Sequence, residues 1–204
     1  MDEMLERIAR HAPGVIGERK KLRCAVVIPL IETEAGYDIL FEVRSNAVPS
    51  QPGDVCLPGG VLEPGETAVQ AAVREACEEL LISPEQLTVI GEADTYEESH
   101  IELRPFAAIL KDYANAFNPA EVAEVFRAPL SYFIDNEPER YRIDFQPLFS
   151  EDFPFDRIVG GKDYGWRRMD HLALFYEVSG HTIWGITARV IRAFSQMAAG
   201  RDET

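Results

Sequence analysis

The chain has 204 residues, and its 46% of hydrophobic and 10% of aromatic residues are enough for one globular domain with a sizeable core. Its 35 acidic and 20 basic residues give a net charge of −15, which argues against nucleic-acid and anionic-membrane partners because both attract positive surfaces. No apolar run is long enough to span a membrane, and the first residues, MDEMLERIAR, lack the apolar segment of a signal peptide.

The N-terminal part of the sequence predicts a helix followed by a hairpin. Residues 2–11 have the pattern of a short amphipathic helix, and we expect residues 1–20 to be a helical extension of a main domain that spans residues 21–204. Leu22–Ile31 is a nearly continuous apolar run, as in a central strand buried on both faces. Tyr37–Val43 follows it after a Glu-Ala-Gly turn, so the two runs predict a hairpin.

The rest of the chain alternates strands and helices. Ala68–Leu81 contains no Gly or Pro and is rich in good helix formers, so a helix is predicted there. The later predicted elements are strands at Leu87–Ala93, Ile101–Leu110, Tyr141–Gln146 and Leu172–Val178, a short helix at Glu121–Phe126, and a C-terminal helix at Thr187–Ala199. This order predicts an α/β fold, an α/β/α sandwich around a mixed β-sheet.

The cysteines are odd in number and widely spaced. Cys24, Cys56 and Cys77 stand in apolar surroundings, which indicates buried, reduced thiols in a cytoplasmic protein. Cys56 precedes the Pro58-Gly59-Gly60 turn by two residues, so a thiol that faces the substrate is the alternative for this position.

The helix at Ala68–Leu81 has a strong start signal and an unusual acidic face. Thr67 and Gln70 have the spacing of a capping box. Glu75, Glu78 and Glu79 are three and four residues apart, so their side chains converge on one patch of the helix. Two interpretations remain at this point, a solvated acidic surface and a site for Mg²⁺ or Mn²⁺, because hard cations prefer carboxylate oxygens.

The residues around this helix resemble the Nudix box. That pattern is a Gly, five residues, a Glu, seven residues, Arg-Glu, an aliphatic residue, any residue, Glu-Glu, any residue, Gly and an aliphatic residue. The positions that match are Gly60, Glu66, Arg74, Glu75, Glu78, Glu79 and Ile82. Two positions depart from it, Ala76 at the aliphatic site and Leu81 at the second glycine. The resemblance implies a Nudix-type α/β/α sandwich and metal-dependent hydrolysis of a diphosphate.

The resemblance also implies a role for each residue of the box. Glu75, Glu78 and Glu79, with the carbonyl of Gly60, would hold Mg²⁺ or Mn²⁺. Arg74 would pair with Glu66 and orient the carboxylates.

The group that accepts the proton of the attacking water is either a box glutamate or an acid from a later loop. Glu121 is the preferred later acid, ahead of Glu97 and Glu98. The alternative for Glu121 is an acid at the start of a helix, favoured there by the helix dipole.

A second resemblance lies just upstream, where Leu40–Gly60 is similar to the motif of coenzyme A pyrophosphatases within the family. Arg44, Ser45, Gly59 and Gly60 would bind the substrate, and a guanidinium suits phosphate. The alternative for Arg44 is a surface ion pair. The motif departs at Glu42, Pro49 and Leu57, and the arginine that Pro49 replaces would have been a further cation. This resemblance implies cleavage of coenzyme A into 3′,5′-ADP and 4′-phosphopantetheine.

Several alternatives follow from the same sequence. The substrate could be another small-molecule diphosphate, such as ADP-ribose, NADH or a deoxynucleoside triphosphate, and a non-catalytic nucleotide-sensing module is a further alternative. The complete set of box carboxylates favours an enzyme. The segment Gly160–His171 could hold an adenine ring and its 3′-phosphate through its cations and aromatic residues, or could be a plain exposed hairpin. The four histidines show no ligand spacing, and the sequence predicts no oligomeric state.

Overall fold

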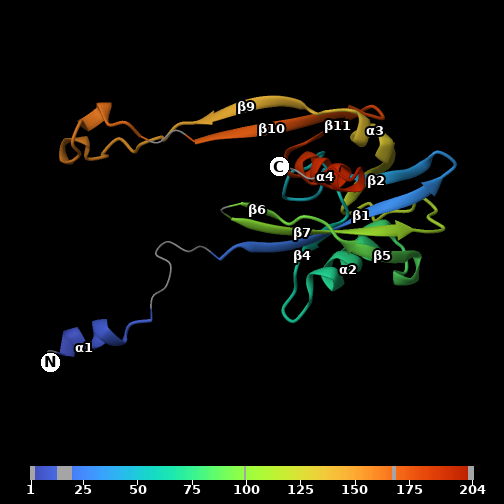
Figure 1. The fold of residues 1–204 in the computed structure, drawn as a ribbon, viewed down its shortest axis with the longest axis horizontal. Coiled ribbons are helices and arrows are strands. Elements are labelled where there is room, and N and C mark those ends of the chain that lie inside the picture. Colours follow the sequence, from blue (N-terminus) through green and yellow to red (C-terminus); the bar gives the residue numbers. More distant parts are fainter. Residues whose placement is uncertain (1–2, 13–19, 99, 167–168, 202–204) are drawn as a thin grey trace.

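A computed structural model describes residues 3–12, 20–98, 100–166 and 169–201 of the chain. Its main sheet has eight strands, in which β1 and β7 are parallel and the other pairings are antiparallel (Figure 1). The strands of this sheet are β1 (Leu22–Thr33), β2 (Gly36–Arg44), β3 (Val55–Cys56), β4 (Gly59–Val61), β5 (Leu87–Glu92), β6 (Tyr96–Glu98), β7 (Ile101–Leu110) and β8 (Val122–Pro129). The predicted mixed sheet is therefore confirmed.

Helices cover the main sheet on both faces. Helix α2 (Ala68–Leu80) packs through a row of small side chains and Leu80 against one face, where Ala71, Ala72, Ala76 and Leu80 are fully buried. Helices α3 (Leu130–Asp135) and α4 (Gly185–Ala198) share a second core with the other face. The predicted α/β/α sandwich is confirmed, and the apolar run of β1 lies between the two cores because its alternate residues contribute to each.

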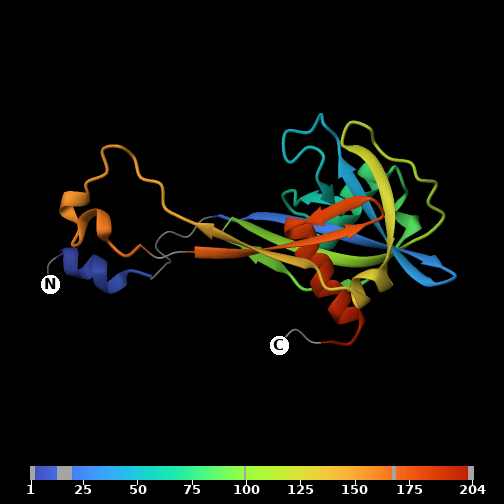
Figure 2. The ribbon, with the colours of Figure 1, turned by 90° about the horizontal axis from the view of Figure 1, so that it is seen from above.

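A second sheet lies outside this sandwich and was not expected from the sequence. It has three antiparallel strands in the order β11-β10-β9, formed by β9 (Glu139–Phe145), β10 (Met169–Val178) and β11 (His181–Trp184). Strands β9 and β10 were predicted, but as members of the main sheet. Figure 2 shows their hairpin running along the body, with the segment that joins the two strands lying beyond it. Short 3₁₀ helices are found at Pro84–Gln86, Phe155–Arg157 and Gly161–Asp163.

The predicted short helix at Glu121–Phe126 is wrong, because this part of the chain is strand β8. Its register with β2 runs from Asp38 opposite Pro129 to Arg44 opposite Val122. Val122 and Phe126 are buried in the sheet, so pairing with the open edge of β2 outweighs the local preference for helix.

The N-terminal helix is confirmed as α1 (Glu3–Arg10), and it buries none of its residues. Residues 13–19 lie outside the described residues, so the division at residue 20 stays a prediction. Within the described part of the chain, no helix is long and apolar enough to cross a membrane.

Candidate active site

The start of α2 is fixed by the capping box that the sequence predicts. The Gln70 amide donates to the Thr67 hydroxyl oxygen at 3.4 Å, and the Thr67 amide donates to the Gln70 side-chain oxygen at 2.9 Å. Both bonds satisfy amides that an uncapped helix leaves without a partner. The cap therefore sets the rotation of the helix, and with it the direction of Arg74, Glu75 and Glu79 one to three turns later.

The end of α2 shows why the family pattern has a glycine there. Leu81 adopts the left-handed conformation, with φ 50° and ψ 46°. The amide of Ile82 donates to the Cys77 carbonyl at 3.2 Å, which closes the helix. The helix thus ends where the pattern requires, although a leucine in this conformation is strained relative to glycine.

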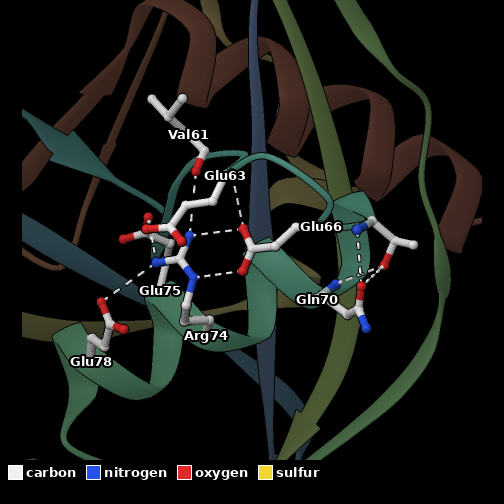
Figure 3. Close-up of polar contacts among 8 residues, drawn as sticks. Val61, Glu63, Glu66, Gln70, Arg74, Glu75 and Glu78 are labelled. Carbon is white, nitrogen blue, oxygen red and sulfur yellow. Dashed lines mark hydrogen bonds and ion pairs between the residues drawn. The ribbon is translucent and has the colours of Figure 1, made fainter.

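Arg74 connects the loop before α2 with the acidic face of the helix (Figure 3). Its Nε and Nη2 donate to the two carboxylate oxygens of Glu66 at 2.8 and 3.1 Å, a bidentate pair. Its Nη1 lies 2.9 Å from Glu75 Oε1 and 3.6 Å from Glu78 Oε2. The hydrogen bonds from Arg74 hold the pKa of Glu66 below its ordinary value. The predicted Arg74–Glu66 pair is present, and the arginine holds Glu75 and Glu78 as expected of an orienting residue.

Glu79 is a buried acid held by the backbone of β4. Only 6% of it is exposed, and its Oε2 accepts a hydrogen bond from the Gly59 amide at 2.8 Å. Burial raises the pKa of Glu79 to about 8, with smaller contributions from the nearby charges of Glu75 and Glu121. Burial likewise raises the pKa of Glu75 above its ordinary value. The carboxylates are therefore gathered in a site that disfavours negative charge until a cation arrives.

The two glycines of β4 allow this close packing. A Cβ at Gly60 would lie 2.6 Å from the carboxyl carbon of Glu75. Gly59 has φ 150°, and a Cβ there would lie 2.3 Å from the carbonyl oxygen of Ala25. Gly59 thus requires glycine, and a side chain at Gly60 would displace the Glu75 carboxylate that lies directly beside its backbone.

A cavity of about 520 Å³ opens beside these groups. Its polar side contains Arg44, Gly59, Gly60, Glu75, Glu79 and Glu121. Its other side is apolar, with residues from the start of β1, the start of β7 and the first turns of α4, among them Leu22, Ile101, Leu103, Ile186 and Val190. Sequence reasoning missed this contribution of α4, because 186–190 follow the catalytic motifs by more than a hundred residues.

Glu121 and Arg44 both line the cavity, and a backbone hydrogen bond joins the segments that carry them. The backbone carbonyl of Glu121 accepts a hydrogen bond from the Ser45 amide at 2.8 Å. The side-chain Oε1 of Glu121 accepts one from the Asn118 side-chain amide at 3.1 Å. Since β8 begins at the next residue, Glu121 is not at the start of a helix, and that alternative is wrong. Arg44 donates to the Ser50 carbonyl at 3.0 Å and forms no ion pair with a described carboxylate, which removes the surface ion-pair alternative.

Other residues considered from the sequence lie outside the cavity. Ser45 is buried and its hydroxyl accepts from the Ala47 amide at 3.2 Å, so it shapes the loop. The Glu78 side chain is 56% exposed and is not among the described residues that line the cavity. Glu97 contacts Lys21, and Glu98 accepts from the Tyr96 hydroxyl at 2.9 Å, so neither lines the cavity.

The segment Gly160–His171 belongs to the outer hairpin rather than to this cavity. Its described residues Lys162, Tyr164 and Trp166 line a separate hollow of about 390 Å³. Arg167 and Arg168 lie outside the described residues.

The structure adds a buried acid that the sequence did not identify as functional. Glu42 on β2 is 1% exposed, and its Oε1 has no hydrogen-bond partner within the described part of the chain. Burial raises its pKa well above the ordinary value, and the charges of Glu79 and Glu121 act in the same direction. The available signal was the departure from the upstream motif, which has threonine at this position.

The cysteines are free thiols and half-buried. Cys24 and Cys56 line the cavity, so the alternative of a thiol facing the site is the one that the structure supports for Cys56. Burial raises the pKa of Cys56 to about 12, so the group stays protonated and is a poor nucleophile.

The donor set suits a hard divalent cation. Among the described residues, no three His, Cys, Asp or Glu side chains are already gathered as a ligand set, because Arg74 holds Glu75 and Glu78 and the Gly59 amide holds Glu79. The available donors are nevertheless carboxylate oxygens, and the Glu75 carboxylate lies beside the backbone of Gly60. Mg²⁺ and Mn²⁺ prefer such oxygen ligands. The raised pKa values of Glu75 and Glu79 show that negative charge is unfavourable here, so a bound cation would stabilise the two carboxylates in their ionised form.

Comparison with known proteins agrees with this site. The family model of the NUDIX domain matches residues 21–143. The Nudix hydrolase NudL of Photorhabdus laumondii, described as uncharacterized, is 30% identical over 175 residues, which are 84% of this chain and 82% of that protein. The peroxisomal coenzyme A diphosphatase of Mus musculus is 35% identical over 113 residues, which are 54% of this chain and 48% of the mouse protein. The mitochondrial Nudix hydrolase 15 of Arabidopsis thaliana is 32% identical over 187 residues, 86% of this chain and 59% of that protein.

Among solved structures, a Caenorhabditis elegans Ap4A hydrolase in a binary complex is similar with a TM-score of 0.46 and 26% identity, covering 56% of this chain and 84% of that one.

The fold and the site together define a hydrolase of phosphate anhydrides. The chain belongs to the Nudix family. It is an enzyme that acts on a nucleoside diphosphate derivative, and members of this family generally use divalent metal ions.

Proposed function

We propose that the chain hydrolyses the diphosphate of coenzyme A or of a coenzyme A derivative, giving 3′,5′-ADP and 4′-phosphopantetheine. The observation that supports this most directly is the placement of Arg44, from the upstream motif, in the same cavity as Glu75 and Glu79. The 35% identity to a peroxisomal coenzyme A diphosphatase over 113 residues adds support.

Mg²⁺ or Mn²⁺ is the proposed cofactor, held by Glu75, Glu78, Glu79 and the carbonyl of Gly60. A bound divalent cation neutralises diphosphate oxygens and lowers the pKa of the attacking water. Glu78 would have to turn from Arg74 toward the cavity, and its exposure leaves it free to rotate.

The protein's own groups have three proposed tasks. The Arg44 guanidinium binds a substrate phosphate, and its orientation is set by the hydrogen bond to Ser50. The backbone of Gly59 and Gly60 lets the diphosphate approach the carboxylates closely. Arg74 keeps the glutamates in position through Glu66 and does not itself contact the substrate.

Glu121 is the proposed proton acceptor for the attacking water. Its carboxyl lines the cavity, and the bond from Asn118 fixes its Oε1, which leaves Oε2 available to accept. Glu75 and Glu79 also line the cavity as proposed cation ligands, and the raised pKa of Glu79, about 8, would suit a base in the absence of a cation. A cation on Glu79 removes that capacity, which is why Glu121 is preferred.

A substrate panel tests the proposal. Purified full-length protein with Mn²⁺ or Mg²⁺ is incubated with coenzyme A, its disulfide, an acyl derivative, ADP-ribose, NADH and deoxynucleoside triphosphates, and products are identified by mass spectrometry. We expect release of 3′,5′-ADP with the highest kcat/KM for a coenzyme A species. Faster turnover of ADP-ribose than of every coenzyme A species would contradict the substrate assignment while leaving the family assignment intact.

We further propose a cytoplasmic location for the protein, which its free thiols and acidic surface support. Fractionation of the source cells with an antibody against the chain tests this, and recovery in an organelle or membrane fraction would contradict it.

A further inference from the structure

The outer sheet has two unlike faces. On the inner face Leu174, Tyr176 and Ile183 are 5%, 2% and 0% exposed and belong to the core that includes α4. The other face presents a row of apolar side chains, which we call the apolar stripe. It consists of Tyr141, Ile143 and Phe145 from β9, Phe175 from β10 and Trp184 from β11. At its β11 end this face borders the main sheet, because Phe175 and Trp184 line a hollow of about 410 Å³ together with Val43 and Val55.

Three aromatic residues of the apolar stripe contact one another, and four of its five side chains are about half open to water. Phe175 stacks on Trp184 with ring centroids 5.8 Å apart and meets Tyr141 edge-on at 5.5 Å. Tyr141 and Phe145 are 55% and 51% exposed, Ile143 is 41% exposed and Trp184 is 42% exposed. Single exposed apolar residues are ordinary, but a connected row of this kind marks an interaction surface.

The outer edge of β9 is also open. In the described part of the chain β9 ends the strand order β11-β10-β9, and all of its residues are exposed. Its pairing with β10 is unbroken from Glu139 opposite Phe175 to Phe145 opposite Met169. Its sequence, ERYRIDF, contains no Pro. Four of its seven residues are charged, which opposes pairing with most strands, but Arg142 and Asp144 carry opposite charges on the same face. In Figure 1 the strand runs along the outer margin of the molecule.

The residues of β9 are complementary to β9 itself. In an antiparallel pair with a two-fold axis at Ile143, Tyr141 faces the partner's Phe145, and Arg142 faces the partner's Asp144. Aromatic pairs and opposite charges are the favourable cross-strand neighbours. Within one copy, Arg142 Nε lies 2.8 Å from Asp144 Oδ1 and 3.5 Å from Asp170 Oδ2, and the Arg142 side chain is 64% exposed. Pairing of two copies would join their two groups of charged side chains into one network.

We propose that two copies of this chain associate through antiparallel pairing of β9 about Ile143, joining their outer sheets into one continuous sheet with a shared apolar stripe. A two-fold interface is self-complementary, as this strand is. The pairing covers the edge of β9 and not Trp184, which lies two strands away, so the half-exposed aromatic side chains Tyr141 and Phe145 supply at most roughly 200 Å² per copy, given that a fully buried aromatic removes about 150–250 Å² from water. Neighbouring side chains and the strand edge contribute toward the roughly 800 Å² per partner of a stable interface.

The mass of the full-length protein tests the proposal by sedimentation equilibrium. We expect twice the chain mass of 22.9 kDa at micromolar concentration. Ile143→Lys places like charges on the axis and should weaken association by roughly 100-fold or more. Ile90→Lys, at a 62% exposed apolar position on β5, is the matched control and should stay dimeric. A monomer at all concentrations would overturn the proposal, as would a dimer that survives Ile143→Lys with its thermal unfolding unchanged.

The register is tested by charge exchange and by cross-linking. Asp144→Arg should weaken association because it faces the partner's Arg142, and Arg142→Asp combined with Asp144→Arg should restore it. Under mild oxidation Ile143→Cys should form a covalent dimer, since directly opposite residues have Cβ atoms about 4.5–5.5 Å apart. Tyr141→Cys should cross-link only when mixed with Phe145→Cys. Failure of the double exchange to restore the dimer, or binding of monomers to neutral lipid vesicles in its place, would overturn the assignment.

Discussion

The two sheets of this protein depart from the usual distribution of residues in opposite ways. The main sheet and α2 enclose the carboxyl groups of Glu42 and Glu79, which are 1% and 6% exposed. The outer sheet leaves Tyr141 and Phe145 more than half exposed. Buried acids cost free energy unless a cation or proton compensates, and exposed aromatic rows cost free energy unless another surface covers them. The buried acids therefore point to a cation and a phosphate in one region, and the exposed aromatic row marks the outer sheet as an interaction surface in the other.

The largest expected effect concerns Glu79. Glu79→Gln keeps the shape of the side chain but cannot ionise, so we expect kcat to fall by about 10³-fold or more. The melting temperature should not fall, because the buried side chain stays uncharged. Steady-state kinetics and thermal unfolding measure the two. The control is Glu85→Gln, an exposed acid beyond the end of α2, which should change neither. Full activity of Glu79→Gln would show that the buried acid has no part in catalysis.

Arg74 should have the next largest effect. Arg74→Lys loses the bidentate pair with Glu66, and we expect kcat/KM to fall by about 10–100-fold, as for residues that orient metal ligands. The matched control is Arg104→Lys, because Arg104 forms a similar pair with Glu92, 2.7 Å between Nη2 and Oε2, outside the described lining of the cavity. Equal losses in the two variants would indicate a general effect on stability instead of a role in the site.

The buried acids predict how stability depends on pH. The pKa of Glu79 is about 8 in the folded protein against an ordinary value of 4.5, so the folded state binds the proton more tightly. This stabilisation is complete below about pH 4.5 and is lost as the pH rises toward 8. Without metal, we expect the free energy of unfolding to fall by on the order of a few kcal/mol between pH 5 and 8.

Urea unfolding in the presence of a chelator measures this dependence, and Glu79→Gln provides its control because the variant should show a flatter profile. A free energy of unfolding that rises over the same range would contradict the assignment of Glu79 as a buried, protonated group.

The smallest effect is expected at the end of α2. Leu81→Gly relieves the left-handed conformation at φ 50° and should raise the free energy of unfolding by about 1 kcal/mol. Ala199→Gly at the end of α4 is the control, since Ala199 has φ −83° and a glycine there only adds flexibility to the unfolded chain. If both substitutions stabilised the protein, or if neither did, the left-handed conformation of Leu81 would not be the cause of the change in the free energy of unfolding.

Much of the site could be predicted because its information is local. The Thr67–Gln70 box, the spacing of Arg74, Glu75 and Glu79, and the glycines of β4 all lie within a few turns of one another along the chain. Helix periodicity alone brings such residues to one side. The Arg74–Glu66 pair follows from the same short separation, and the structure contains it.

Other features depended on partners far away in the sequence. The segment at Val122–Pro129 is a strand because the edge of β2, about eighty residues earlier, is open to pair with it. Glu42 is buried beside Glu79 only because β2 lies under α2, and periodicity could not distinguish this position from an outward-facing one.

The sequence by itself determined the family, the acidic helix α2 and most of the strands, since capping, periodicity and motif spacing act over short distances. Tertiary structure alone decided that β9, β10 and β11 form a separate sheet, that α4 lines the cavity, and that one apolar stripe stays exposed. These outcomes depend on which surfaces are left to cover once the main sheet has formed, and that competition among distant segments has no local signal in the sequence.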